Sequence, residues 1–123
     1  MRVLFVTPEC APLTKTGGLG DVSAALPAAL REAGVEVRTL MPAYPQAGSG
    51  ACVAQFPVLG FDCRLLEAGP MLLLDCPALY AREGGPYQDP EGRDWADNGL
   101  RFGVLSRAAG LLATPASPLS WEP

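Results

Sequence analysis

The chain has no histidine among its 123 residues and a single lysine, Lys15. Within these residues there can therefore be no Ser-His-Asp or Cys-His nucleophile pair and no zinc site with imidazole ligands. The chain has nine basic and thirteen acidic side chains, which gives a net charge of −4. General nucleic-acid binders neutralise phosphates with an excess of positive charge, and this chain lacks that excess. We expect no nucleic-acid partner.

Long apolar runs and paired cysteines are also missing. The apolar run Val3–Val6 is too short for a secretory leader, and no stretch approaches the ~20 apolar residues of a membrane span. No C-x-x-C pair occurs, and no acidic cluster has the spacing of metal ligands, so we expect no metal site. These absences favour a cytoplasmic protein without a membrane partner. We expect reduced, mostly buried thiols at the four cysteines, which are Cys10, Cys52, Cys63 and Cys76.

The first third of the sequence predicts a βαβ unit. Residues 2–7 are apolar on both faces, which is typical of a central parallel strand. A loop follows at 8–18, and then a helix over 19–33 that Pro27 should kink or weaken. A second strand is expected at 35–41. The helix should turn one apolar stripe toward the core, formed by Val22, Ala25, Leu26, Ala29, Leu30 and Ala33.

The remainder predicts further strands and a second long helix. Residues 51–58 and 61–67 indicate a hairpin, and 71–75 indicate a buried strand. A polar loop at 82–94 leads to a helix over 96–113, with Asp94 or Asp97 as its N-cap. The proline-rich tail from 114 to 123 should be irregular. The length fits one domain, and the fold class is α/β with a parallel sheet.

The loop before the first helix carries the most chemistry. Lys15-Thr16-Gly17-Gly18-Leu19-Gly20-Asp21 lies between a strand and a helix, where free backbone N–H groups and the helix dipole favour an anion. Adjacent glycines let a phosphate approach the backbone, and Lys15 adds a full positive charge. The alternative is a glycine-rich turn that serves packing alone. Neither a Walker A loop nor the G-x-G-x-x-G dinucleotide fingerprint fits these residues.

At this point the residues can be compared with a family. The stretch from Met1 (M-R-V-L-F-V-T-P-E-C-A-P-L-T-K-T-G-G-L-G-D-V) resembles the N-terminus of bacterial glycogen synthases and plant starch synthases. The K-T-G-G-L-G-D-V block is specific to that family. The likeness spans nearly the whole chain and continues at A-L-P-A-A-L (25–30), M-P-A-Y-P (41–45), D-C-P-A-L-Y (75–80), G-G-P-Y-Q-D (84–89) and D-N-G-L-R-F (97–102).

The resemblance implies a retaining glucosyltransferase of the GT-B fold. Such an enzyme transfers glucose from ADP-glucose to the non-reducing end of an α-1,4-glucan such as glycogen, without a cofactor or metal. Residues 1–123 would form part of the Rossmann-like N-terminal domain, on the glucan-acceptor side. Lys15 resembles the family's lysine that contacts the donor diphosphate or glucose, and Gly17 and Gly18 resemble backbone donors to the same groups. Asp21 matches an acidic cleft position, or it complements the helix dipole.

The region from 80 to 98 has a composition suited to sugars. Trp95 matches a family aromatic near the cleft, and Asn98 is a further cleft candidate. Tyr80, Tyr87 and Trp95 could stack on pyranose rings, or they could anchor a long loop on the core. Acceptors and donors for sugar hydroxyls would be Asp89, Asp94, Asp97 and Asn98, although the acids could equally form a solvated loop and cap a helix.

The chain also departs from the family pattern. The nucleotide-binding C-terminal domain is absent, and so are the family's histidine-containing motif and its Arg and Glu catalytic residues. We therefore expect a fragment of a synthase that is inactive by itself. The alternatives are a non-catalytic truncated domain or glucan-binding remnant, and a nucleotide-cofactor oxidoreductase. The second lacks the acidic residue that should end its second strand, since this strand ends at Met41-Pro42.

Overall fold

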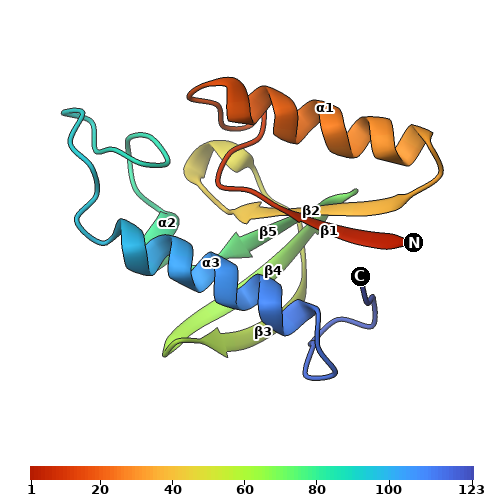
Figure 1. Ribbon diagram of the computed structural model, residues 1–123. Helices are drawn as coiled ribbons and strands as arrows, with labels where there is room; N and C mark the ends of the chain where they lie inside the picture. The colour runs from red at the N-terminus through yellow and green to blue at the C-terminus, as the bar shows by residue number, and fades with distance from the viewer.

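A computed structural model describes all 123 residues. Five strands form one sheet in the order β1-β2-β5-β4-β3, with helices packed on both of its faces (Figure 1). The strands are β1 (Arg2–Val6), β2 (Glu36–Pro42), β3 (Ala51–Val58), β4 (Phe61–Ala68) and β5 (Met71–Asp75). The helical elements are α1 (Gly18–Glu32), the short 3₁₀ turn η1 (Pro45–Ala47), α2 (Pro77–Tyr80) and α3 (Asn98–Leu112).

The sheet is parallel in one half and antiparallel in the other. β1 pairs with β2 and β2 with β5 in parallel, so the predicted βαβ unit is confirmed. β3 and β4 form the expected antiparallel hairpin, and β4 also runs antiparallel to β5. The α/β class is therefore correct, with a mixed sheet in place of a wholly parallel one.

The position predicted for the first strand is wrong. β1 lies at the edge of the sheet and has one neighbour, β2. Its apolar residues are partly covered, and Val6 at its end is exposed. A strand that is apolar on both faces indicates that helices cover both faces of the sheet. It does not indicate whether the strand has one neighbouring strand or two.

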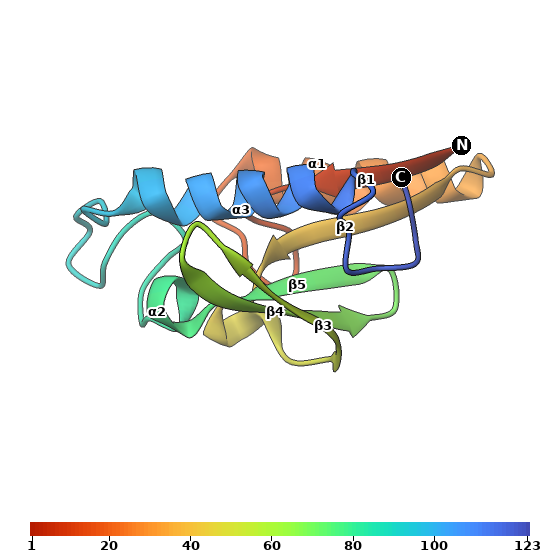
Figure 2. The ribbon, with the colours of Figure 1, turned by 90° about the horizontal axis from the view of Figure 1, so that it is seen from below.

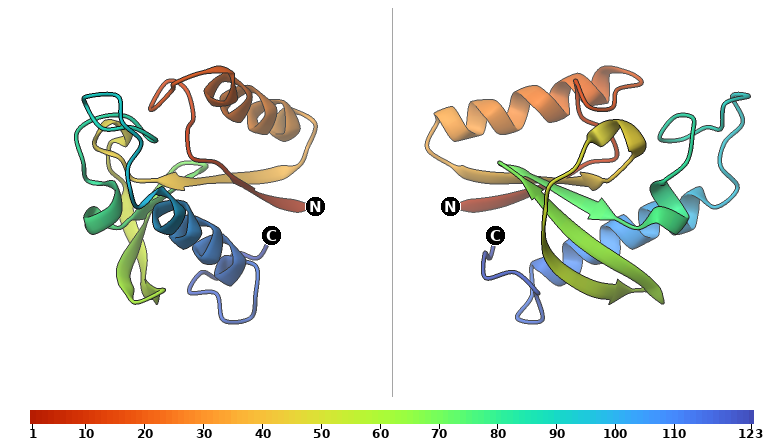
Figure 3. Two further views of the ribbon diagram at one scale, coloured as in Figure 1. Left: turned by 60° about the vertical axis from the view of Figure 1, so that its left-hand side comes forward. Right: turned by 180° about the vertical axis from the view of Figure 1, so that it is seen from behind.

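The two long helices cover opposite faces of the sheet. α1 packs on β2, whereas α3 lies across β1, β2 and β3 on the other side. The left view of Figure 3 shows β1 and β2 between these helices, and Figures 2 and 3 show the two chain termini close together at one end. The β1–α1 loop and the loop before α3 lie at the same end of the molecule, beyond the carboxyl ends of the parallel strands (Figure 1).

The apolar stripe predicted for the first helix does not face the sheet. The buried residues of α1 are small: Gly20, Ser23 and Pro27. The large apolar residues Leu19, Val22 and Leu26 are 45%, 51% and 44% exposed. The helix continues through Pro27 and does not end there. The remaining stripe members, Ala25, Ala29 and Ala33, are exposed as well, and Leu30 is half-buried.

The core occupies both faces of the sheet, since the consecutive residues Leu72, Leu73 and Leu74 of β5 are all fully buried. It comprises 19 buried residues, among them Leu40, Leu72 and Leu74 of the parallel strands. From the stripe predicted for α3, Val104, Leu105, Ala108 and Leu112 are buried, Leu111 is half-buried and Leu100 is exposed. The tail is irregular as expected. No helix of the chain combines the length and apolar character needed to cross a membrane.

Candidate functional site

The loop between β1 and α1 is held by contacts along its whole length. Tyr44, just after β2, donates its hydroxyl to the Pro8 carbonyl at 2.7 Å. Cys10 and Thr14 pair through their backbones, and the Ala11 N–H donates to the Gly20 carbonyl at 3.0 Å. The glycine-rich segment is therefore presented in a defined conformation at the carboxyl end of β1.

Glu9 is the centre of this loop. Glu9 is buried, with 3% of its surface exposed. Its Oε2 accepts hydrogen bonds from the Thr16 N–H at 2.6 Å and from the Thr16 hydroxyl at 3.0 Å. Its Oε1 accepts from the Tyr87 hydroxyl at 3.0 Å. Burial raises the pKa of Glu9, but these hydrogen bonds, with the nearby Gly17 N–H, lower it further than burial raises it. Glu9 is thus an ionised internal anion.

Lys15, the one lysine of the chain, points to the start of α1. Lys15 Nζ pairs with the Asp21 carboxylate at 2.9 Å, and the Lys15 side chain is 47% exposed. Asp21 lies in the first turn of α1. Both sequence candidates are therefore in contact, and Asp21 can orient the ammonium group. Exposure leaves that group able to exchange Asp21 for an incoming anion.

Gly17 and Gly18 form the N-terminus of α1. Gly17 is the N-cap with an extended backbone and no side-chain cap, and a β-carbon at either glycine would meet open space. The N–H groups of Gly18 and Leu19 donate to no protein acceptor. Free N–H donors at an open helix N-terminus suit an anion or a hydroxyl oxygen. One backbone donor of the predicted anion-binding loop is not free, because the Thr16 N–H donates to the Glu9 carboxylate.

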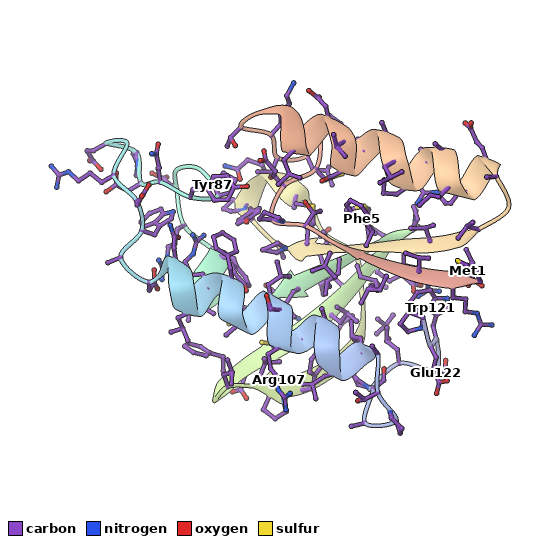
Figure 4. All side chains as sticks on the ribbon, in the orientation of Figure 1. Met1, Phe5, Tyr87, Arg107, Trp121 and Glu122 are labelled. Atoms are coloured by element: carbon purple, nitrogen blue, oxygen red, sulfur yellow. The ribbon has the colours of Figure 1, made fainter.

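The second loop, from Ala81 to Asp97, reaches the first through Tyr87. Figure 4 shows Tyr87 directed from this loop toward the segment that precedes α1. Burial, together with the hydrogen bond to Glu9, raises the pKa of Tyr87 to about 12. Of the other cleft candidates, Trp95 donates its Nε1–H to the Gly85 carbonyl at 3.1 Å, and the Asn98 amide donates to the Tyr87 carbonyl at 2.9 Å. Both brace the loop that carries Tyr87.

Arg101 is the buried cation under this loop, and sequence reasoning missed it. It is 1% exposed and donates to the carbonyls of Leu79 and Pro86 and to Asn98 Oδ1, at 2.7–2.8 Å. Burial lowers the pKa of Arg101. A signal was available, since a charged residue at position 101 interrupts the buried stripe of a helix, and buried arginines are rare without strong partners.

Two shallow pockets flank the contact between the loops. One, of about 320 Å³, is lined by Thr16, Gly85, Tyr87, Gln88 and Asp89. The other, of about 360 Å³, has Lys15, Thr16 and Gln46 on its wall together with Thr14, whose buried hydroxyl lacks a hydrogen-bond partner. Polar, open hollows of this size suit a hydroxyl-rich or phosphorylated ligand better than an apolar one.

One sugar-stacking role and one side-chain capping bond considered from the sequence are wrong. Tyr80 is 1% exposed and donates its hydroxyl to the Arg101 carbonyl at 2.6 Å, so it cannot stack on a ligand. Asp97 is the N-cap residue of α3 but makes no capping bond, because both of its oxygens accept from Arg82 at 2.7 Å. That pairing lowers the pKa of Asp97. No three His, Cys, Asp or Glu side chains gather where they could hold a metal ion, and all four cysteines are free.

Comparison with known proteins gives the family of the chain. The family model of the starch synthase catalytic domain matches residues 2–123. The glycogen synthases of Dechloromonas aromatica and Nitrosospira multiformis are 54% and 49% identical, and each alignment covers 100% of this chain. The chain spans 28% of the length of these relatives.

A solved structure shares the fold. The catalytic domain of starch synthase IV from Arabidopsis thaliana, bound to ADP and acarbose, superposes with a TM-score of 0.63 at 25% identity. The match covers 86% of this chain and 24% of that one. The family model alone accounts for all but the first residue of this sequence. The chain therefore belongs to the starch synthase catalytic-domain family, which includes the bacterial glycogen synthases.

Proposed function

We propose that this chain forms the donor-contacting and glucan-acceptor side of a glycogen synthase. The complete enzyme would transfer glucose from ADP-glucose to the non-reducing end of an α-1,4-glucan with retention of configuration. The names of the relatives support the glycogen product, and the ADP and acarbose bound to the plant homologue support a nucleotide donor and a glucan-like acceptor. We propose a cytoplasmic enzyme that needs no metal or cofactor.

One observation carries the proposal: a half-exposed cation and free backbone donors converge at the start of α1. Lys15 Nζ is tethered by Asp21 but remains half-exposed, and the N–H groups of Gly18 and Leu19 have no protein acceptor. Departure of a nucleoside diphosphate from a sugar develops negative charge on the leaving oxygens. Preorganised positive charge and N–H donors lower the free energy of such a transition state.

The surrounding residues have supporting roles in this proposal. Glu9 fixes the loop through Thr16, so the donors need no reorganisation when substrate arrives. Tyr87 lines the adjacent pocket, where its ring would contact a sugar while its hydroxyl stays on Glu9. Trp95 and Asn98 would act on substrate through the loop that they brace.

The test uses a chimaera of Dechloromonas aromatica glycogen synthase in which residues 1–123 of this chain replace the aligned segment. In the chimaera, Lys15→Ala should lower kcat for radiolabelled glucose transfer by on the order of 100-fold or more, as expected when one charge-stabilising contact is lost. The matched control is Arg107→Ala, which removes one exposed positive charge from α3, far from the loop (Figure 4).

Three outcomes separate the proposal from its alternative. Transfer by the parent chimaera, with loss in Lys15→Ala and retention in Arg107→Ala, supports the proposal. Near-parental turnover in Lys15→Ala would contradict the role of this lysine. A chimaera that folds but transfers no glucose would favour the alternative, a non-catalytic or glucan-binding remnant. The 123-residue chain alone should show no transfer in the same assay.

A further inference from the structure

A buried cation holds the loop that connects α2 to α3. We propose that Arg101 is a positioning residue for glucose transfer: it sets where Tyr87 meets Glu9, and through Glu9 it places the glycine-rich loop. This role rests on the proposed function of that loop and concerns how the loop is held ready for its ligand. Arg101 itself would not contact substrate, because it is 1% exposed.

Arg101 holds the backbone at Tyr87 and at the residue before it. Its Nη1 donates to the Pro86 carbonyl at 2.7 Å and to Asn98 Oδ1 at 2.8 Å. The Asn98 amide in turn donates to the Tyr87 carbonyl at 2.9 Å. The Nε–H of Arg101 donates to the Leu79 carbonyl in α2 at 2.8 Å. One guanidinium therefore fixes this segment relative to both flanking helices.

Other parts of this loop are held without Arg101. Arg82, after α2, donates to both oxygens of Asp97, before α3, at 2.7 Å, so the two ends of the loop are closed. Asp89 accepts two backbone N–H groups of the loop at 2.9 Å and fixes its outer turn. What Arg101 adds is the position of the segment that carries Tyr87.

Burial of this guanidinium is costly, which indicates that its hydrogen bonds do more than fill space. Arg101 takes part in none of the five salt bridges of the chain. The Asp97 carboxylate, one turn before it, is already paired with Arg82. A buried charge without a carboxylate partner lowers stability. An apolar residue, like Val104 and Leu105 on the same helix, would fill the buried stripe at a lower cost.

The three acceptors around this group suit an arginine. They are two backbone carbonyls and one amide oxygen, all within 2.7–2.8 Å of a guanidinium nitrogen. A guanidinium presents five N–H donors in a rigid plane, whereas an ammonium group on a flexible stem does not keep fixed directions. The rings of Tyr80, Trp95 and Phe102 pack around the guanidinium carbon at 5.5–5.9 Å. Arg101→Lys therefore keeps the charge and loses the geometry.

The segment at Tyr87 connects α3 with the glycine-rich loop. The Tyr87 ring packs on Phe102 of α3, with 5.8 Å between ring centroids, and its hydroxyl donates to Glu9 Oε1 at 3.0 Å. The other Glu9 oxygen accepts from the N–H and the hydroxyl of Thr16, directly before the start of α1. A shift of about 1 Å at Tyr87 would break its bond to Glu9. Misplacement on this scale can lower turnover by about 100-fold.

Kinetics of the Dechloromonas aromatica chimaera test this role. Arg101→Lys should lower kcat for glucose transfer by about 10- to 100-fold and leave KM for ADP-glucose near its parental value, because the donors are present but misplaced. Tyr87→Phe should lower kcat in the same way. The double variant should be no slower than the slower single variant, because both changes break the same connection to Glu9.

Val104→Ala is the matched control for a merely structural role. Val104 is fully buried and lies three residues after Arg101 on α3. Its truncation should lower the melting temperature and leave kcat at the parental value below that temperature. If Arg101→Lys yields no folded protein, Asn98→Ala takes its place. That change removes the bond to the Tyr87 carbonyl, so it should give a smaller loss of kcat that again does not add to the loss in Tyr87→Phe.

Hydrogen exchange in the same chimaera gives a readout that needs no glucose transfer. The Thr16 N–H donates to Glu9, whereas the Thr14 N–H donates to a carbonyl within the same loop. In Arg101→Lys the Thr16 amide should exchange at least about fivefold faster relative to the Thr14 amide. The ratio should stay parental in Val104→Ala. Comparison of two amides in one loop corrects for any difference in global stability.

Three results would overturn the proposal. The first is a loss of kcat in Arg101→Lys no larger than in Val104→Ala, which would make the role merely structural. The second is parental kcat in Tyr87→Phe, or a loss in the double variant equal to the product of the two single losses. The third is an unchanged ratio of Thr16 to Thr14 exchange in Arg101→Lys. If the parent chimaera transfers no glucose, the proposed function fails, and the exchange ratio alone decides whether Arg101 places the loop.

Discussion

Glu9 fixes the position of the loop that carries the glycine-rich motif. Its carboxylate joins Thr16, seven positions along the chain, with Tyr87, 78 positions along it. Lys15, Gly17 and Gly18 could be proposed from the sequence because they are contiguous between a strand and a helix. Glu9 could not, because its partners are set by how two distant loops meet. The spacing of residues within one helix or strand gives no information about the contact between Glu9 and Tyr87.

The ionised state of Glu9 predicts how stability depends on pH. Its pKa in the folded chain lies below the ordinary value of 4.5, so the native state releases its proton more readily than the unfolded state. The stabilisation is therefore present above about pH 4.5 and is lost as the pH falls through the folded pKa. Glu9→Gln should lower the free energy of unfolding by about 1–3 kcal/mol at pH 7, because its amide cannot accept at both ends.

Urea denaturation at pH 7 and pH 3.5 measures this contribution. The difference between Glu9→Gln and the parent should shrink at the lower pH, because below about pH 4.5 the unfolded parent takes up a proton at Glu9 that the folded parent binds less readily. Glu83→Gln is the matched control, since Glu83 is exposed in the second loop. A gap between Glu9→Gln and the parent that stays constant or widens at pH 3.5 would contradict an ionised Glu9.

At the level of elements, α1 shows what helical periodicity can and cannot predict. The spacing of its apolar residues correctly indicated a helix. It assigned the wrong face to the sheet, because close packing of helix against sheet is achieved here by Gly20, Ser23 and Pro27. The Ser23 hydroxyl even hydrogen-bonds to Thr7 at the end of β1, at 2.8 Å. Periodicity identifies which residues share a face, and the partner of that face is decided by the rest of the fold.

Gly20 provides an element-scale prediction. A β-carbon at Gly20 would lie 2.9 Å from Lys15 Cγ and 3.3 Å from Glu9 Oε2. Gly20→Ala should therefore displace the Lys15 stem and destabilise the chain by about 1 kcal/mol or more, although alanine is the better helix former. Gly103→Ala, within α3 and with open space at its β-carbon, should stabilise by up to about 1 kcal/mol.

Thermal melting of the two alanine variants gives the comparison directly. We expect opposite signs, with Gly20→Ala melting below the parent and Gly103→Ala melting above it. If both variants melt above the parent, the β1–α1 loop is loose enough to move away, and the close packing of Lys15 on the helix start does not constrain the site.

At the scale of the whole molecule, local contacts were predictable and long-range ones were not. The strand from Met71 to Asp75 and the β3–β4 hairpin follow from short apolar runs bounded by glycine and proline. The sheet order could not be obtained from such runs, because it depends on pairings between distant segments. The same holds for Arg101, whose carbonyl acceptors are Leu79 in α2, 22 residues away, and Pro86 in the following loop, 15 residues away.

Trp121 attaches the C-terminal tail to the sheet. Its ring is 8% exposed, its N–H bonds to Glu36, and Arg38 packs on one face. Trp121→Ala should lower the free energy of unfolding by about 3 kcal/mol, because it removes a buried aromatic group. Trp121→Phe keeps a ring for Arg38 and loses the hydrogen bond, so it should cost about 1 kcal/mol. The effects are read from urea midpoints followed by far-ultraviolet circular dichroism. If Trp121→Ala unfolds at the parent midpoint, the tail contributes nothing to the stability of the folded sheet.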